Sequence, residues 1–131
     1  MIVDSSALIA ILRQEPERPR LLERLASIDE CVRISAANLL EAAIVADGTH
    51  DPEFSNQFDA IVADFTIEIA PVTAEHAHLA REAYRRFGKG NHRARLNFGD
   101  CFAYALSKAT GEPLLFKGDD FTHTDVVPAL T

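Results

Sequence analysis

Apolar residues follow two alternating patterns along the chain, namely short continuous runs and helical spacings of three and four. The short runs predict buried strands at residues 2–3, 31–34, 67–69 and 114–116. The helical spacings predict helices at about residues 5–12, 16–28, 36–47, 52–64, 73–87 and 99–110. We expect a further edge strand at 125–127. Short apolar strands that alternate with helices predict one α/β domain over residues 1–131, with a mostly parallel central sheet flanked by helices on both faces.

Several apolar side chains on the early helices have two interpretations. They belong either to the core or to a surface that binds a partner: Leu8, Leu12, Leu22 and Leu25. Ile28 is expected on the same apolar helix face as Leu22 and Leu25. A second group is expected in the core rather than as platforms for stacked bases: Phe54, Phe58, Phe65, Phe98 and Phe102.

Length and composition are those of an ordinary globular protein. The 131 residues are 47% hydrophobic and 25% charged, far from the composition of disordered segments. No apolar run approaches the roughly 20 residues that span a bilayer. The first residues carry no basic flank, so we expect no signal peptide and a cytoplasmic protein without membrane contact.

The two cysteines, Cys31 and Cys101, are 70 positions apart. Zinc sites use closely spaced Cys or His ligands, and this spacing argues against one. In a reducing compartment we expect both residues to be buried, reduced thiols.

The net charge of −7 argues against a protein that binds nucleic acid simply by being basic. Residues 76–97 nevertheless carry six basic side chains against one acid, a local charge of +5 that leaves −12 for the rest. This basic segment is a candidate track for an RNA backbone, and its alternative role is a solvated face or salt bridges to the acidic body. It contains Arg81, Arg85, Arg86, Lys89, Arg93 and Arg95.

Acidic residues stand where the predicted strands end. Asp4 follows the first strand, and the pair Asp119-Asp120 follows the last. Asp100 lies in the first turn of its helix and Glu41 about one turn inside the helix after the second strand. In open α/β sheets the functional crevice lies beyond the carboxyl ends of the strands, so these acids converge if the strands are neighbours.

Converging carboxylates repel one another, and a divalent cation neutralises that repulsion. Ligands that are all oxygen select Mg²⁺ or Mn²⁺ rather than zinc. Such an ion generates a hydroxide nucleophile and stabilises charge on a phosphodiester. Each acid also has a plain structural alternative: a helix cap for Asp4, a partner of the helix dipole for Asp100, and a turn for 118–120.

Four segments resemble motifs of the PIN-domain family, particularly its VapC-type toxins. They occur in the family's order: 1–8 with Asp4 and Ser6, 35–42 with Glu41, 96–101 with Asp100, and 114–121 with Asp119-Asp120. Many relatives carry Thr or Ser two positions before the fourth acid, whereas this chain reads Phe116-Lys117-Gly118 there. We favour Asp119 as the fourth acid and keep Asp120 as the alternative.

The resemblance implies a PIN-like fold and Mg²⁺- or Mn²⁺-dependent endonucleolytic cleavage of RNA. It also implies a cognate VapB-type antitoxin that blocks the site, a toxin homodimer within a larger complex, and binding of promoter DNA only through the antitoxin. We expect Asp4, Asp100 and Asp119 to hold the metal and Glu41 to orient the attacking water or a second ion. Supporting roles are expected for Ser6, Asn38 and Asn97, each with helix capping as the alternative.

Three other functions remain to be weighed. A receiver-like signalling domain also has an acidic Mg²⁺ pocket, but it uses two adjacent acids early in the chain, and Asp4 has no acidic neighbour. A catalytically inactive PIN fold that only binds partners is disfavoured because all four motifs retain an acid. DNA in place of RNA is compatible with the same chemistry, and only the family resemblance favours RNA.

Overall fold

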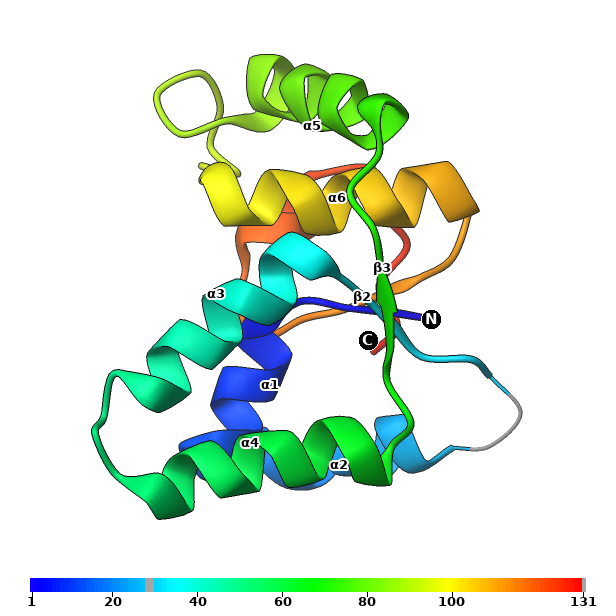
Figure 1. Ribbon diagram of the computed structural model, residues 1–131. Helices are drawn as coiled ribbons and strands as arrows, with labels where there is room; N and C mark the ends of the chain where they lie inside the picture. Colours follow the sequence, from blue (N-terminus) through cyan, green and yellow to red (C-terminus); the bar gives the residue numbers. More distant parts are fainter. Residues whose placement is uncertain (28–29, 131) are drawn as a thin grey trace.

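A four-stranded sheet with all strands parallel runs through the centre of the molecule. In the computed structural model, which describes residues 1–27 and 30–130, the strand order is β3-β2-β1-β4 (Figure 1). The strands are β1 (Ile2–Val3), β2 (Arg33–Ser35), β3 (Glu68–Ala70) and β4 (Leu114–Leu115). The first strand is therefore central, and the second and fourth strands flank it.

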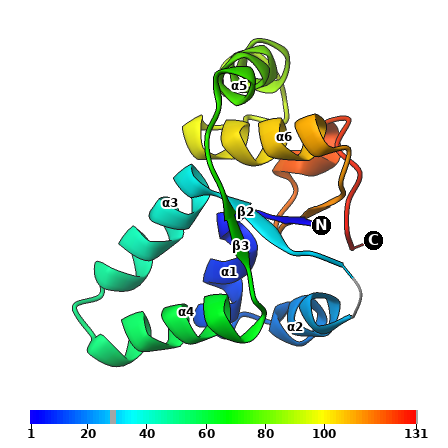
Figure 2. The same ribbon diagram turned by 45° about the vertical axis from the view of Figure 1, so that its right-hand side comes forward.

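Helices cover both faces of this sheet (Figures 1 and 2). On one face lie α1 (Ser5–Leu12), α2 (Arg18–Ala26), α3 (Ala36–Asp47) and α4 (Pro52–Asp64). On the other lie α5 (Ala74–Phe87) and α6 (Phe98–Thr110), followed after β4 by the short 3₁₀ helix η1 (Asp120–His123). The predicted α/β architecture is confirmed.

The alternation of side chains along the strands divides the interior into two cores. Val3, Ile34 and Leu115 contribute to the core under α1–α4. Ile2 and Leu114 point to the opposite face and pack with α5 and α6. The central strand β1 and its neighbour β4 are buried on both faces and therefore consist of continuous apolar residues. The edge strand β3 is largely exposed and begins with Glu68.

The predicted helices and strands occur close to their expected positions. The expected edge strand at 125–127 is replaced by an isolated parallel bridge between Leu114 and Pro128. The backbone N–H of Leu114 donates to the carbonyl of Val127 over 2.8 Å, and Ala129 donates back to Leu114 over 2.8 Å. This segment therefore pairs with β4 for too short a stretch to form a strand.

The leucines of the first two helices belong to the core and not to a partner-binding surface. Leu8, Leu12 and Leu25 are buried, and Leu22 is partly buried against the same cluster. The predicted role of Ile28 falls outside the described residues. Within residues 1–27 and 30–130, no helix combines the length and apolarity needed to cross a membrane.

Two expectations about burial are wrong. Phe98 is 82% exposed, because it is the first residue of α6 and projects from the helix end, where it meets the ring of Phe102 edge-on. Cys31 is exposed as well, since it precedes β2, and its thiol donates to Glu68 Oε2 over 3.2 Å. Cys101 is buried as expected, and both thiols are free.

A polar network holds the C-terminal segment against α6. The buried Tyr104 hydroxyl donates to Asp125 Oδ1 over 2.8 Å, and Lys108 Nζ lies 3.1 Å from Asp125 Oδ2. Arg86 of α5 lies 3.7 Å from the same carboxylate oxygen. One acid therefore ties α5, α6 and the chain end together.

We expect Tyr104→Phe to lower the free energy of unfolding by about 1–2 kcal/mol, because a buried hydrogen bond to a charged acceptor is lost. Urea denaturation measures this change. Tyr84→Phe is the matched control, since Tyr84 is half exposed and no described residue bonds its hydroxyl. Equal stability of the two variants would contradict the proposed importance of the network.

Candidate active site

Asp4 lies at the centre of the site, between the end of β1 and the start of α1. It is only 1% exposed. Its Oδ2 accepts from the backbone N–H of Ser6 over 3.0 Å, so it is the N-cap of α1. Its other oxygen, Oδ1, is buried without a hydrogen-bond partner. The capping role explains one oxygen of this carboxylate and leaves the second unexplained.

Asp100 lies in the first turn of α6 and forms a capping box with Asn97. Asn97 Oδ1 accepts from the Asp100 N–H over 2.9 Å, and Asp100 Oδ2 accepts from the Asn97 N–H over 3.0 Å. Both residues therefore fill the structural roles considered for them. Asp100 is in addition partly buried beside the other acids, and capping alone does not account for that position.

Glu41 reaches the same place from α3. Its Oε1 accepts hydrogen bonds from the hydroxyl of Ser5 and from Asn38 Nδ2, the latter over 3.4 Å. Its carboxylate rests against Gly99, the residue before Asp100. Ser5 and Asn38 therefore supply protein partners for this carboxylate.

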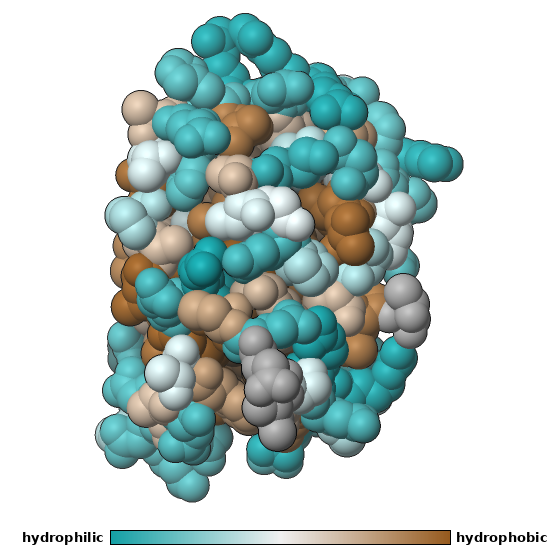
Figure 3. Space-filling model, turned by 90° about the vertical axis from the view of Figure 1, so that its right-hand side faces the viewer, coloured by the Kyte–Doolittle hydropathy of each residue, from teal (hydrophilic) through white to brown (hydrophobic). Residues whose placement is uncertain are grey.

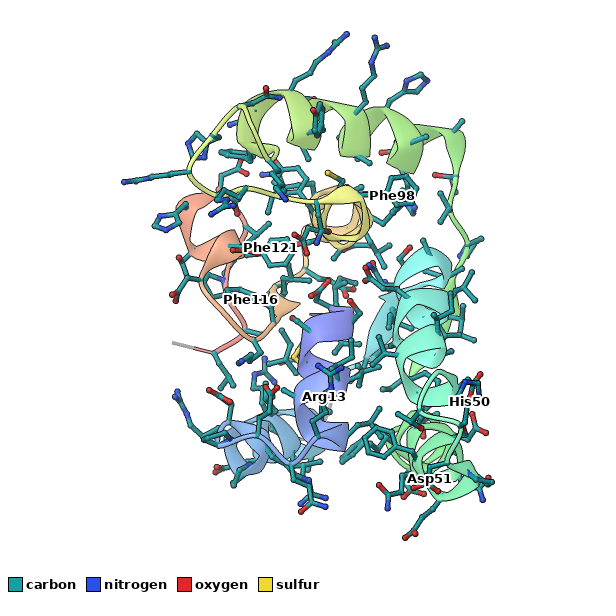
Figure 4. The ribbon with its side chains drawn as sticks, turned by 90° about the vertical axis from the view of Figure 1, so that its left-hand side faces the viewer. Arg13, His50, Asp51, Phe98, Phe116 and Phe121 are labelled. Atoms are coloured by element: carbon teal, nitrogen blue, oxygen red, sulfur yellow. The ribbon has the colours of Figure 1, made fainter. Side chains whose placement is uncertain are left out.

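Electrostatic interactions link these acids into one group. Burial, together with the negative charges of Asp100 and Glu41, raises the pKa of Asp4 from its ordinary 3.8 to about 7. Burial also raises the pKa of Asp100 to about 6, with contributions from Asp120 and Glu41. Figure 4 shows side-chain oxygens gathered between the starts of α1 and α6. The strand ends therefore bring the four acidic regions together, as their order suggested.

The two acids of the fourth motif are placed differently relative to η1 and α6. Asp120 is the acid whose charge acts on Asp100. Its neighbour Phe121 is buried beneath α6 and packs on Phe116, with ring centroids 5.2 Å apart (Figure 4). This anchor fixes the first turn of η1 beside α6. Asp119 precedes that turn, and its backbone carbonyl, at the N-cap position, accepts from Thr122.

Ser6 and Lys117 connect the first and fourth motifs. The backbone N–H of Lys117 donates to Ser6 Oγ over 3.0 Å, and Ser6 N–H in turn holds Asp4. The Lys117 ammonium points elsewhere, to Glu15 at 3.1 Å. Ser6 therefore acts here as a link between the loop after β4 and the start of α1.

The basic segment divides into paired and unpaired residues. Arg86 interacts with Glu82, Asp125 and the ring of Phe87, so it has a structural role. Arg81 and Arg85 are exposed on α5 and form no ion pair within the described part of the chain. The remaining three lie exposed in the loop that leads into α6: Lys89, Arg93 and Arg95.

Sequence reasoning missed two residues of the site, Ser5 and Gly99. Ser5 directly follows Asp4 and is buried, and its hydroxyl donates to Glu41. Gly99 had a detectable signal, because glycine is unfavourable inside a helix and often marks a close approach. What approaches Gly99 is visible only in the tertiary structure.

Comparison with known proteins places the chain in a family. The PIN domain matches residues 1–127. Ribonuclease VapC28 of Mycobacterium tuberculosis is 49% identical over 131 residues, which cover 99% of this chain and 98% of the relative. Ribonuclease VapC42 of the same species is 46% identical over the full length of both chains. The chain belongs to the VapC group of the PIN-domain family.

Solved structures share its fold. The crystal structure of Mycobacterium tuberculosis VapC20, described as a sarcin–ricin loop cleaving toxin, has a TM-score of 0.78 at 20% identity and covers 99% of this chain and 98% of that one. VapBC2 from Rickettsia felis, bound to a promoter DNA fragment, has a TM-score of 0.73 at 16% identity over 97% of this chain and 94% of that one. These likenesses confirm the fold expected from the motifs.

The donor set of the site fits a hard divalent cation. The acids offer only oxygen ligands, and Asp4 Oδ1 is a buried acceptor without a donor. Within the described residues, no three His, Cys, Asp or Glu side chains are already arranged to hold an ion. Protein donors hold Glu41 and Asp100 in their present positions. The residues that would hold the ion are Asp4, Asp100 and an acid of the fourth motif.

The raised pKa of Asp4 predicts how stability depends on pH without metal. The folded protein keeps the Asp4 proton up to about pH 7, whereas the unfolded chain releases it near the ordinary pKa of 3.8. The free energy of unfolding therefore falls as pH rises between these values. Asp4→Asn removes this penalty and keeps a good N-cap.

We expect Asp4→Asn to be more stable than the original protein at pH 8, by on the order of 3–4 kcal/mol, and equally stable below about pH 4. Denaturant titrations across this pH range in the presence of a chelator measure the difference. Parallel stability profiles for the two proteins would show that ionisation of Asp4 does not lower the stability of the fold.

Proposed function

We propose that this protein is a Mg²⁺- or Mn²⁺-dependent endoribonuclease and the toxin of a VapBC-type toxin–antitoxin pair. The observation that carries the proposal is the convergence of Asp4, Glu41, Asp100 and Asp120 at the strand ends, with the pKa values of Asp4 and Asp100 raised. Such a cluster is costly without a cation and is therefore kept for function. All four motifs retain an acid, which disfavours an inactive binding module.

The proposed roles follow from the position of each acid. A bound Mg²⁺ or Mn²⁺ would supply Lewis-acid stabilisation of charge on the phosphodiester and lower the pKa of a water. Asp4 and Asp100 would hold the ion, with Asp120 completing the site in preference to Asp119. Glu41 orients the attacking water. Attack on phosphorus breaks the bond to the 3′ oxygen and leaves a 5′-phosphate and a 3′-hydroxyl.

RNA as the substrate is supported by the relatives. The curated relatives are named ribonucleases, and VapC20 is described as cleaving the sarcin–ricin loop. Backbone contacts would come from the unpaired cations of α5, Arg81 and Arg85, and from the loop residues Lys89, Arg93 and Arg95. Arg86 is removed from this set because Asp125 and Glu82 already bind it.

A VapB-type antitoxin is the proposed partner. Structures with the same fold include a toxin–antitoxin complex from Klebsiella pneumoniae, at 16% identity and a TM-score of 0.72, and the Rickettsia felis complex bound to promoter DNA. By analogy, the antitoxin covers the acidic site, and the complex reaches promoter DNA through the antitoxin.

We expect the purified, antitoxin-free protein to cleave total cellular RNA when Mg²⁺ or Mn²⁺ is added and to lose this activity with a chelator. Asp100→Asn should lower the rate of cleavage at least 100-fold. The variant should keep the fold, since Asn still accepts a hydrogen bond in the first turn of α6. Gel analysis and sequencing of the fragment ends measure both.

Single-stranded DNA of matched length is incubated in parallel. If the protein cleaves DNA but not RNA, then DNA is its substrate in place of RNA. A folded protein that binds Mn²⁺ yet cleaves neither polymer would instead support the inactive binding module.

An exposed apolar face supports the proposed homodimer. Six large apolar side chains come from α3, β3 and the segment after it, α5 and the first turn of α6, elements that contact one another: Leu40, Ile44, Ile69, Val72, Tyr84 and Phe98. Figure 3 shows apolar residues along its left-hand edge, which is the front of Figure 1. Monomeric proteins rarely leave such a face in water.

We expect Ile44→Glu to convert the dimer to a monomer, because the charge would have to be buried in the interface. Sedimentation velocity at several protein concentrations measures the change. Val127→Glu is the control, since Val127 is as exposed, at 64% against 61%, but lies at the opposite edge of the sheet beside β4. Identical sedimentation of both variants and the original protein would count against this face.

A further inference from the structure

We infer that Ser5, Asn38 and Gly99 form a clamp that fixes the Glu41 carboxylate and assigns different tasks to its two oxygens. The clamp joins α1, α3 and α6 around one side chain. The inference rests on the proposed function for the task of Glu41, but the clamp itself consists of contacts present in the folded chain. Ser5, Asn38 and Gly99 are positioning residues, since they act through Glu41.

Oε1 is the anchored oxygen. The Ser5 hydroxyl donates to it from the first turn of α1, and Asn38 Nδ2 approaches it at 3.4 Å from one turn earlier on α3. Ser5 is 6% exposed and Asn38 is completely buried, so water does not compete for these donors. Hydrogen bonds shielded in this way hold a side chain more firmly than exposed ones.

Asn38 also locks α3 to α6. Its Nδ2 donates to the backbone carbonyl of Gly99 over 2.9 Å. Both contacts of this amide therefore use the same nitrogen, which sets the orientation of the side chain. If the first turn of α6 moved, Asn38 Nδ2 would move with it and would displace Glu41. The clamp therefore keeps Glu41 at a fixed position relative to Asp100.

Gly99 leaves room for the Glu41 carboxylate because it has no side chain. A Cβ atom at this position would lie 2.1 Å from Glu41 Oε2 and 2.7 Å from Glu41 Cδ. Nonbonded atoms do not approach this closely, so even alanine would push the carboxylate away. The obstructing atoms are the far end of a flexible side chain, and the backbone has no need to shift. The fold tolerates alanine here, whereas the present position of Glu41 does not.

Oε2 is the oxygen of Glu41 that we assign to the attacking water. Within the described residues no donor is hydrogen-bonded to it, while Oε1 has two. An oxygen held in place but free of protein donors is suited to accept a hydrogen bond from a water that attacks phosphorus. Glycine at position 99 also carries a cost, because it is a poor helix former. The clamp explains why glycine occupies the first turn of α6.

The test is a set of double-mutant cycles between the clamp and Glu41. We expect Gly99→Ala to keep the fold but to lower kcat for RNA cleavage at least 10-fold with KM little changed. We expect Ser5→Ala to lower kcat as well. In a Glu41→Ala background, measured under single-turnover conditions with excess protein, neither substitution should reduce cleavage further, because the group they position is absent.

Ser55→Ala is the matched control for Ser5. The Ser55 hydroxyl also donates to an acid, Asp47 Oδ1, over 2.7 Å, but on an exposed surface away from the site. We expect it to leave cleavage unchanged. Full activity of Gly99→Ala, or losses that add to that of Glu41→Ala, would overturn the clamp.

A second readout is independent of catalysis. Urea unfolding of Ser5→Ala, Glu41→Ala and the double variant should show a coupling between the two sites, whereas Ser55→Ala and Glu41→Ala should be additive. Additive effects of Ser5 and Glu41 would overturn the clamp even if RNA is cleaved. Coupling in a protein that cleaves no RNA would retain the clamp and reject the proposed function.

Discussion

The burial of the Asp4 carboxylate is the constraint on which the rest of the site depends. A charged group in the interior is costly unless it is paired, and here only one of its oxygens has a donor. The remaining acids increase the cost, because Asp100 and Glu41 are negative neighbours. The hydrogen bond from the Ser6 N–H at the start of α1 offsets part of this cost, and below about pH 7 the folded protein keeps Asp4 protonated. Stability is thus reduced at the position that the proposed chemistry needs.

The topology of the sheet explains why these acids meet. β1 is central and parallel to both neighbours, so the chain leaves β1, β2 and β4 at the same edge. α1 and α3 begin directly at that edge, and α6 packs across it with its own first turn towards Glu41. A parallel sheet therefore concentrates helix starts, and with them backbone N–H groups, around a cluster of carboxylates.

Small structural elements then set the place of each acid. Ser5 and Asn38 hold Glu41, the capping box holds Asp100, and the burial of Phe121 beneath α6 sets Asp120 beside Asp100. The apolar cores bury β1 and β4 on both faces and supply the stability that the acidic cluster lowers.

Local patterns in the sequence were sufficient to predict the strands of the sheet, the helices, and the capping by Asp4 and Asn97, because periodicity and capping act over a few residues. Long-range contacts decided the rest. The charge of Asp120 acts on Asp100 because of how Phe121 packs, and Ser5 and Gly99 contact Glu41 because α1 and α6 approach it. The exposure of Phe98 and Cys31, and the pairing of Arg86 with Asp125, follow from where element ends meet in space. Residue spacing along the chain does not encode such meetings, because they arise from the packing of segments that are distant in sequence.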